Sequence, residues 1–267
     1  MTAFNSVKPM IGRFFKPRLV ATRSFSSGTA LDYLRVRSGS NDEAIARQWT
    51  RAGFHVTNHP HIQERHQVIV GAVTLDLLPR DDSDDTDYRS GLVDRLKFQN
   101  LPSNAQTINN SIMVSRSSRN RNMNFESSKH PNGIIRVDHI VIKTSELDNV
   151  EHSISNELQM PLRRRGEMKG KRMLWYRNAM LPDTPIIEVV ECEPTQKSGK
   201  SCSTFVWGIS FVTNVLEIMR DTIGHEHVSE IRPAKQPGRN ICTLKNNFEL
   251  GIKVAVMTPH STARSSE

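Results

Sequence analysis

The chain has 267 residues, 36% of them hydrophobic, and a formal net charge of +8 at pH 7. This length fits one large or two small domains. Most of the excess charge lies in residues 1–31, which contain five basic residues and no acidic one. The rest of the chain is close to balanced and does not indicate a nucleic-acid-binding protein. No apolar run approaches the ~20 residues of a membrane-spanning helix, so we expect no membrane partner.

The first 28 residues are rich in Arg and Ser and lack acidic side chains, a composition typical of a mitochondrial presequence. The stretch "TRSFSS" resembles the cleavage context of such presequences. Pro9 and Pro17 interrupt the amphipathic helix that presequences usually form, and a disordered basic tail is the alternative. We expect residues 1–28 to be removed and the protein to lie in the mitochondrial matrix.

Residues 29–80 predict a strand, "LDYLRVRSG", a helix, "AIARQWTRAGF", and further strands, "HQVIVGA" and "VTLDLLP". This order is a degenerate βαβββ unit. The acidic run "RDDSDDTDY" and a Ser-, Asn- and Arg-rich stretch follow, and they predict a disordered linker over residues 81–133.

Residues 134–259 predict two further units. The first begins with the strand "IIRVDHIVIKT" and a helix that places Val150, Ile154 and Leu158 on one face. The strands "RMLWYRNAML" and "PIIEVVEC" complete it. The second contains "FVWGISFVT", a helix ending at Gly224, "NICTLKN" and "GIKVAVMTP". Residues 260–267 form a loose tail.

The units repeat in detail. Leu31-Asp32-Tyr33 aligns with Val137-Asp138-His139, and Leu75-Asp76-Leu77 aligns with Ile187-Glu188-Val189. Three units cannot pair evenly within one chain. Residues 30–79 therefore either form an extra sheet or pair with the same unit of a second chain, in a homodimer.

The stretches "VDHIVIKTSELDNV", "YRNAMLPDTPIIEVVE", "WGISFVT" and "QPGRNICTL" together resemble the vicinal oxygen chelate superfamily, in its glyoxalase-like branch. The resemblance covers about residues 134–259, with a weaker copy in residues 30–79. It implies an α+β fold in which paired βαβββ units form a glyoxalase/bleomycin-resistance-like cup. Such a cup holds a divalent metal and a small substrate.

The resemblance assigns metal-ligand positions to His139 on the first strand and Glu188 on the last strand of a unit. These donors suit Zn, Fe, Mn, Ni or Co. The paired unit departs from the family pattern, because it offers Trp207 and Gly208 on its first strand and no carboxylate on its last. Catalytic metal sites usually have three protein ligands. A polar pair in a cup that has lost its metal, or a hydrogen-bonded core histidine, are the alternatives.

Other candidate contacts lie on strands and turns of the same cup. Substrate binding is assigned to Trp175, Arg177, Trp207 and Arg239, with core packing as the alternative for the strand that carries Trp175 and Arg177. The basic stretch "LRRRGEMKGKR" either meets an anionic group at the rim or forms a solvated hairpin.

The resemblance implies a protein that acts on a small oxygenated or carbonyl-bearing metabolite, as a lyase, an isomerase or epimerase, or a dioxygenase. His139 and Glu188 would be catalytic, with Glu188 as general base if no metal binds. Fold alone does not establish that the protein is an enzyme. A non-catalytic binding or assembly module is the alternative, and an RNA- or ribosome-associated protein is a third class.

Overall fold

The computed structural model describes residues 29–37, 41–60, 62, 65–79, 93–117, 129–179, 181, 184–193, 203–245 and 248–260. The expected presequence lies outside the described residues, as do parts of the expected linker and most of the expected tail.

The N-terminal half of the described chain forms one sheet, in the strand order β2-β3-β4-β1-β5-β7-β6. Its strands are β1 (Ala30–Arg37), β2 (Val56–Asn58), β3 (His66–Val70), β4 (Val73–Leu78), β5 (Val93–Gln99), β6 (Thr107–Ile108) and β7 (Ile112–Arg116). Helix α1 (Asp42–Arg51) begins where the Asn41 side chain accepts a hydrogen bond from the Ala44 backbone N–H at 2.8 Å. Ile45 and Trp49, one helical turn apart, bury the face of α1 that meets the core.

Residues 93–117 belong to this sheet, so the prediction of a disordered linker was wrong there. Strand β5 runs antiparallel to β1 and parallel to β7. Leu96 and Phe98 are fully buried and alternate with Arg95 and Lys97, which is the pattern of a half-buried strand. This alternation is short and lies within a polar segment, so the sequence alone did not predict a strand there. Since β1 finds a partner within its own chain, the argument that an odd unit requires a second chain no longer holds.

The C-terminal half forms a second sheet, in the order β13-β14-β15-β12-β8-β11-β10-β9. Its strands are β8 (Ile134–Thr144), β9 (Leu162–Met168), β10 (Lys171–Tyr176), β11 (Ile186–Glu191), β12 (Phe205–Thr213), β13 (Arg232–Pro233), β14 (Asn240–Thr243) and β15 (Lys253–Met257). Strand β8 is parallel to β11, β12 is parallel to β15, and β8 and β12 are antiparallel at the centre. This pairing of two βαβββ units confirms the predicted fold class.

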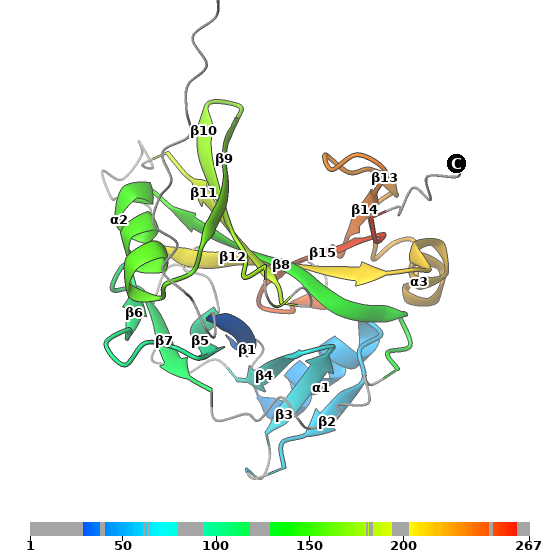
Figure 1. The fold of residues 1–267 in the computed structure, drawn as a ribbon. Coiled ribbons are helices and arrows are strands. Elements are labelled where there is room, and N and C mark those ends of the chain that lie inside the picture. The colour runs from blue at the N-terminus through cyan, green and yellow to red at the C-terminus, as the bar shows by residue number, and fades with distance from the viewer. Residues whose placement is uncertain are drawn as a thin grey trace, which may run out of the picture.

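Two helices complete the C-terminal units. Helix α2 (Leu147–His152) continues into a π-helical turn, Ser153–Glu157, and α3 (Leu216–Ile223) follows β12. Val150, Ile154 and Leu158 are all fully buried, as their spacing predicts. In Figure 1 the β9–β10 hairpin and the β13–β14 pair rise on either side of β8, while the N-terminal sheet lies on the opposite side of β8 and β12. The C-terminal sheet is therefore curved, with an open face directed away from the other half.

The two halves share one hydrophobic core. The Phe54 ring, which follows α1, lies 5.2 Å from the Phe211 ring on β12 and 4.9 Å from the Trp49 ring. His130 connects the halves through polar contacts: its Nδ1 accepts from the His55 backbone N–H at 3.0 Å, and its Nε2 lies 2.9 Å from the Ile69 carbonyl oxygen. The halves should therefore unfold together. Within the described chain, none of the helices has the length and apolar character that crossing a membrane requires.

Phe54→Ala tests this shared core. Removing the ring leaves a cavity between the halves, and we expect the free energy of unfolding to fall by about 3–5 kcal/mol in denaturant titration. The control is Ile218→Ala on α3, where the side chain is 60% exposed. That change should stay within about 0.5 kcal/mol of wild type. Two separate transitions in Phe54→Ala, with the C-terminal one unshifted, would contradict a shared core.

Candidate functional site

A β-bulge places Asp138 beside His139. In the β8–β12 ladder His139 lies opposite Ser210 and Val137 lies opposite Phe211, so Asp138 is an extra residue without a partner position. A bulge of this kind bends the strand and redirects side chains that would otherwise alternate between faces. As a result, Asp138 Oδ2 lies 2.8 Å from His139 Nδ1.

His139 is held on both sides of its ring. Because an ionised carboxylate only accepts hydrogen bonds, Asp138 assigns the proton of neutral His139 to Nδ1. The other nitrogen, Nε2, lies 2.9 Å from Ser210 Oγ and 3.6 Å from Glu188 Oε2. The His139 residue is only 9% exposed. The lone pair of Nε2 is therefore directed at a hydroxyl and a carboxylate on the neighbouring strands.

Asp138 also binds a buried arginine. Arg239, just before β14, donates from Nη2 to Asp138 Oδ1 at 3.0 Å and from Nη1 to Asp138 Oδ2 at 3.3 Å. Burial alone would raise the pKa of Asp138, but hydrogen bonds from His139 and Arg239, and their charges, lower it well below its usual value. Asp138 is thus ionised at neutral pH.

The same arginine is held by further protein groups. Arg239 Nε donates to the Thr258 carbonyl at 2.7 Å and Nη1 donates to Gln236 Oε1 at 2.6 Å. It was predicted to contact substrate, but the structure places its guanidinium, 3% exposed, behind Asp138. Its contacts thus position Asp138, and through it His139.

Glu188 lies on β11 at the level of Val141 on β8 and Trp175 on β10. The Arg164 guanidinium carbon lies 5.1 Å from the Trp175 ring centroid, a cation–π contact. Gly166 allows the ring to lie flat on β9, because a Cβ there would come within 2.9 Å of it. Trp175, predicted to contact substrate, is therefore a cross-strand neighbour of Glu188.

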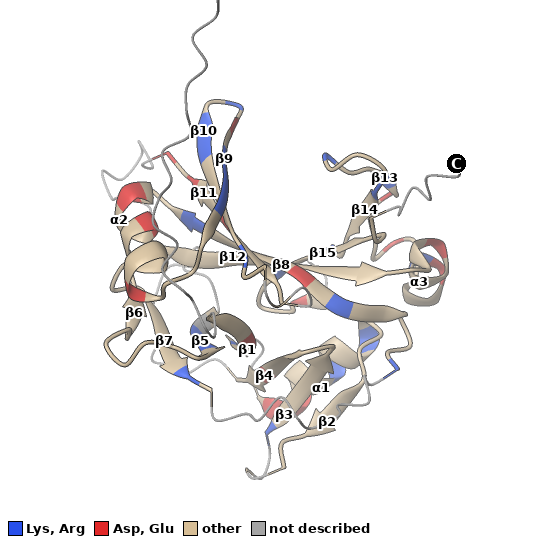
Figure 2. Cartoon of the chain, in the orientation of Figure 1, with Lys and Arg blue, Asp and Glu red and all other residues tan. Residues whose placement is uncertain are grey.

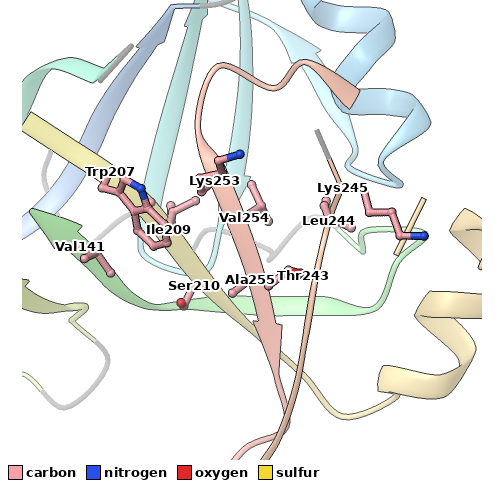
Figure 3. Close-up of a pocket in the computed structure, with 11 residues that line it drawn as sticks. Val141, Trp207, Ile209, Ser210, Thr243, Leu244, Lys245, Lys253, Val254 and Ala255 are labelled. Atoms are coloured by element: carbon pink, nitrogen blue, oxygen red, sulfur yellow. The ribbon is translucent and has the colours of Figure 1, made fainter. Parts of the chain in front are cut away.

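A pocket of about 350 Å³ is lined by Ser210, the hydroxyl neighbour of His139, and by Val141, the strand partner of Glu188, but not by His139 or Glu188 themselves. Figure 3 shows its lining, which comes from β8, β12, β14 and β15 and includes Ser210 and Trp207. Trp207, predicted to contact substrate, is 40% exposed, and its ring centroid lies 3.9 Å from Lys143 Nζ. Burial, and then the nearby charge of Lys171, lower the pKa of Lys143. The pocket thus combines an aromatic surface with positive charge.

Arg177 and the predicted basic stretch lie on or next to the β9–β10 hairpin. Arg177 follows the end of β10, where its carbonyl accepts a hydrogen bond from Arg163 Nε at 2.9 Å. Figure 2 shows the basic residues along the β9–β10 hairpin. Arg165 binds Glu151, and Arg172 binds Glu191 and Asp148. The guanidinium groups of Arg165 and Arg172 are therefore already paired with acidic side chains of the protein.

Sequence reasoning missed three residues that shape the site. Asp138 was noted only as part of the repeat, Ser210 was overlooked in favour of Trp207 and Gly208, and Lys143 was not considered. The bulges explain the error on β12, because Trp207 is itself an extra residue between the pairs Val206–Ile142 and Gly208–Val141. Counting alternate positions along a strand fails when the strand contains a bulge.

His139 Nε2 and Glu188 are suitable donors for a divalent metal, and a carboxylate on the second imidazole nitrogen is common in such centres. However, the residues that the structure describes contain no group of three His, Cys, Asp or Glu side chains able to hold a metal. Ser210 and Ala255 lie on the adjacent strands in line with His139. The donor set does not fit a resident catalytic metal.

Asp138→Asn tests the buried ion pair. It leaves Arg239 buried without a counter-ion, and we expect the free energy of unfolding at pH 7 to fall by about 3–5 kcal/mol. Because the folded-state pKa of Asp138 is lowered, the stability that its charge contributes is full above about pH 5 and is lost as the pH falls through about 3.9 toward the folded value. The difference between wild type and variant in urea titrations should therefore shrink with acidification.

The control for that experiment is Asp148→Asn, which removes an exposed partner of Arg172. It should cost no more than about 1 kcal/mol. Equal losses in the two variants, or a difference that does not change with pH, would show that the Asp138 charge is not stabilising.

No known family profile matches this sequence. No curated protein matches it either.

Solved structures do match the fold. A triple mutant of 4-hydroxymandelate synthase from Streptomyces coelicolor superposes with a TM-score of 0.57, covering 87% of this chain and 93% of that one at 11% identity. A fusion of a xylose isomerase-like TIM barrel with 4-hydroxyphenylpyruvate dioxygenase gives a TM-score of 0.58, with 87% of this chain and 49% of that one covered at 11% identity. Both halves of the chain are therefore included in the likeness. The chain therefore shares the fold of these two proteins, with a mixed sheet of βαβββ-like units in each of its halves.

Proposed function

We propose that the C-terminal cup binds a small, anionic, carbonyl-bearing metabolite and that Glu188 removes a proton next to the carbonyl group. The observation that carries this proposal is the approach of His139 Nε2 to Glu188 Oε2, at 3.6 Å, with Ser210 joining His139 to the lining of a pocket. The reaction class would be isomerase- or epimerase-like proton transfer. The proposed reaction uses these side chains without a metal, because the set of metal donors among the described residues is incomplete.

Glu188 and His139 can act as general base and general acid, respectively. A carboxylate on a rigid strand can abstract a proton from a carbon adjacent to a carbonyl, and a histidine within reach can return it. Asp138 fixes the orientation of His139 and stabilises the imidazolium that forms when Nε2 takes up a proton. Glu188 would take the proton from the substrate carbon and pass it to His139 Nε2, and the imidazolium would then return a proton to the enolate carbon.

Positive charge at the pocket supports the choice of an anionic substrate. Lys143, Lys245 and Lys253 lie in or next to the pocket. Preorganised cations stabilise an enolate as its charge develops. Trp207 offers an apolar surface for the body of the ligand.

A non-catalytic binding module is the second candidate. It is favoured by the paired unit, which presents Ser210 and Ala255 in line with His139 rather than further ligands or bases. The same pocket would then hold an anionic ligand without turnover.

Glu188→Gln separates these candidates. Wild-type protein in D₂O should exchange the protons next to the carbonyl of a suitable 2-oxo acid or acyl thioester, followed by proton NMR over a panel of such compounds. In the variant the exchange rate should fall by about 10²–10⁴-fold, the usual contribution of a general base. Glu191→Gln is the matched control on the same strand, since Glu191 binds Arg172 at the surface. Its rate should equal that of wild type.

Exchange that survives in Glu188→Gln would contradict the proposed base. Binding to the panel without any exchange in wild type would favour the binding module.

Metal content gives an independent test. Elemental mass spectrometry of the protein, purified without chelators or a metal-binding tag, should find well below one divalent metal per chain, because two protein ligands hold such an ion weakly. A stoichiometric metal that disappears in both His139→Ala and Glu188→Gln would contradict this expectation. It would restore the metal-dependent lyase and dioxygenase hypotheses.

A further inference from the structure

The N-terminal sheet repeats the local geometry of the candidate site. On β1 and β4, Tyr33 pairs with Thr74 and Asp76 lies opposite Arg35. On β8 and β11, His139 pairs with Ile186 and Glu188 lies opposite Val141. In both halves the acidic residue lies opposite the position two residues after the aromatic ring, Arg35 in one case and Val141 in the other. Tyr33 and Asp76 thus occupy the places of His139 and Glu188.

The bulge is repeated as well. Between β1 and β5, Leu31 pairs with Phe98 and Tyr33 pairs with Lys97, which leaves Asp32 as the extra residue. Asp32 corresponds to Asp138, and Lys97 corresponds to Ser210. The backbone that supports the C-terminal site therefore exists a second time, with different side chains on it.

These side chains contact one another. The Tyr33 hydroxyl donates to Asp76 Oδ2. Lys97 Nζ lies 4.1 Å from the centroid of the Tyr33 ring, and Arg65 Nη1 lies 3.7 Å from Asp76 Oδ2. Burial, followed by the hydrogen bond to Asp76 and its charge, raises the pKa of Tyr33 above its usual value. The tyrosine is accordingly a neutral donor at physiological pH.

Basic side chains lie around this cluster on β1 and β5. Arg35 and Arg95 face each other across β1 and β5, where like charges destabilise a sheet. Burial lowers the pKa of Lys97, and the charges of Arg95 and Arg35 lower it further, against the effect of Asp76 and Asp32. Lys97 and Arg95 thus bring two basic side chains to the β5 side of the cluster. Their charges would stabilise an anionic group placed next to them.

Two polar atoms of the cluster lack a protein partner. Asp76 is 1% exposed, yet none of the described residues donates a hydrogen bond to its Oδ1. The buried Nε of Arg95 also finds no acceptor among the described residues. Buried polar groups in native proteins are usually hydrogen-bonded, so Asp76 Oδ1 calls for a hydrogen-bond donor and Arg95 Nε calls for an acceptor, and a ligand with both a hydroxyl and an anionic group offers the two.

We propose that the N-terminal half holds a second small-molecule site, centred on Tyr33 and Asp76, that binds a hydroxylated anion. A phosphate or carboxylate of the ligand accepts hydrogen bonds from Lys97 and Arg95, and a hydroxyl of the ligand donates to Asp76 Oδ1. This site is independent of the reaction proposed for the C-terminal cup, because it shares no residue with it.

Fluorine NMR of the full chain labelled with 3-fluorotyrosine tests this site directly. The chain has three tyrosines, and the Tyr33 resonance is the one that disappears in Tyr33→Phe. We expect saturable shifts of this resonance on titration, at constant ionic strength, with 3-phosphoglycerate. Inorganic phosphate and malate are titrated in parallel, and whichever of the two shifts Tyr33 more identifies phosphate or carboxylate as the preferred anion.

Matched variants locate the binding. Lys97→Gln and Arg95→Gln should each weaken the 3-phosphoglycerate titration by roughly tenfold or more, the usual effect of losing a charge-assisted hydrogen bond. Lys97→Arg, which keeps the charge, should bind within a few-fold of wild type, and so should Lys143→Gln in the other cup. Circular dichroism melts show whether each variant is folded. A Tyr33 resonance that does not respond to any of the three anions, or that titrates identically in folded Lys97→Gln, would overturn the proposal.

Discussion

The buried carboxylate of Asp138 organises the C-terminal half of this protein. An ionised group with 5% exposure is stable only when several partners compensate the loss of water, and here two hydrogen bonds come from Arg239 and one from His139. Arg239 in turn joins the segment before β14 to the end of β15. One charge therefore connects the edge strands of the cup to its centre and sets the orientation of the imidazole.

The contact with Arg239 also determines the chemical role of Asp138. Because Asp138 is held from behind by Arg239, it can bind the Nδ1 proton of His139 without itself taking part in proton transfer. His139 Nε2 and Glu188 are left facing the open side of the sheet. Asp138 and Arg239 thus hold the site in place, while His139 and Glu188 are the groups that can react. These residues come from β8, β11 and the segment before β14.

Sequence patterns predicted the central units well, because β8 and β12 are long runs of β-branched residues and α2 has a clear apolar face. The juxtaposition of His139 and Glu188 followed from a family resemblance, and their register agrees with it. Strand β5 was missed because its alternation of Leu96 and Phe98 with charged residues spans only a few positions within a polar segment. Ser210 was missed because no feature of the sequence marks the bulge at Trp207, which depends on pairing between strands far apart in the chain.

The bulged strands limit which sequence changes this fold can accept during evolution. Side chains on a strand alternate between faces, so a shift of one residue exchanges the whole set that faces the cup with the set that faces the core. Loss of one residue from β8 ahead of His139 would place the Asp138 carboxylate against apolar packing. The two halves differ where Tyr33 stands for His139 and Asp76 for Glu188, yet β1 and β4 keep the same register as β8 and β11. Strand length is therefore the strict constraint on this fold, and side-chain identity at the cup is the variable on which different binding chemistries can be built.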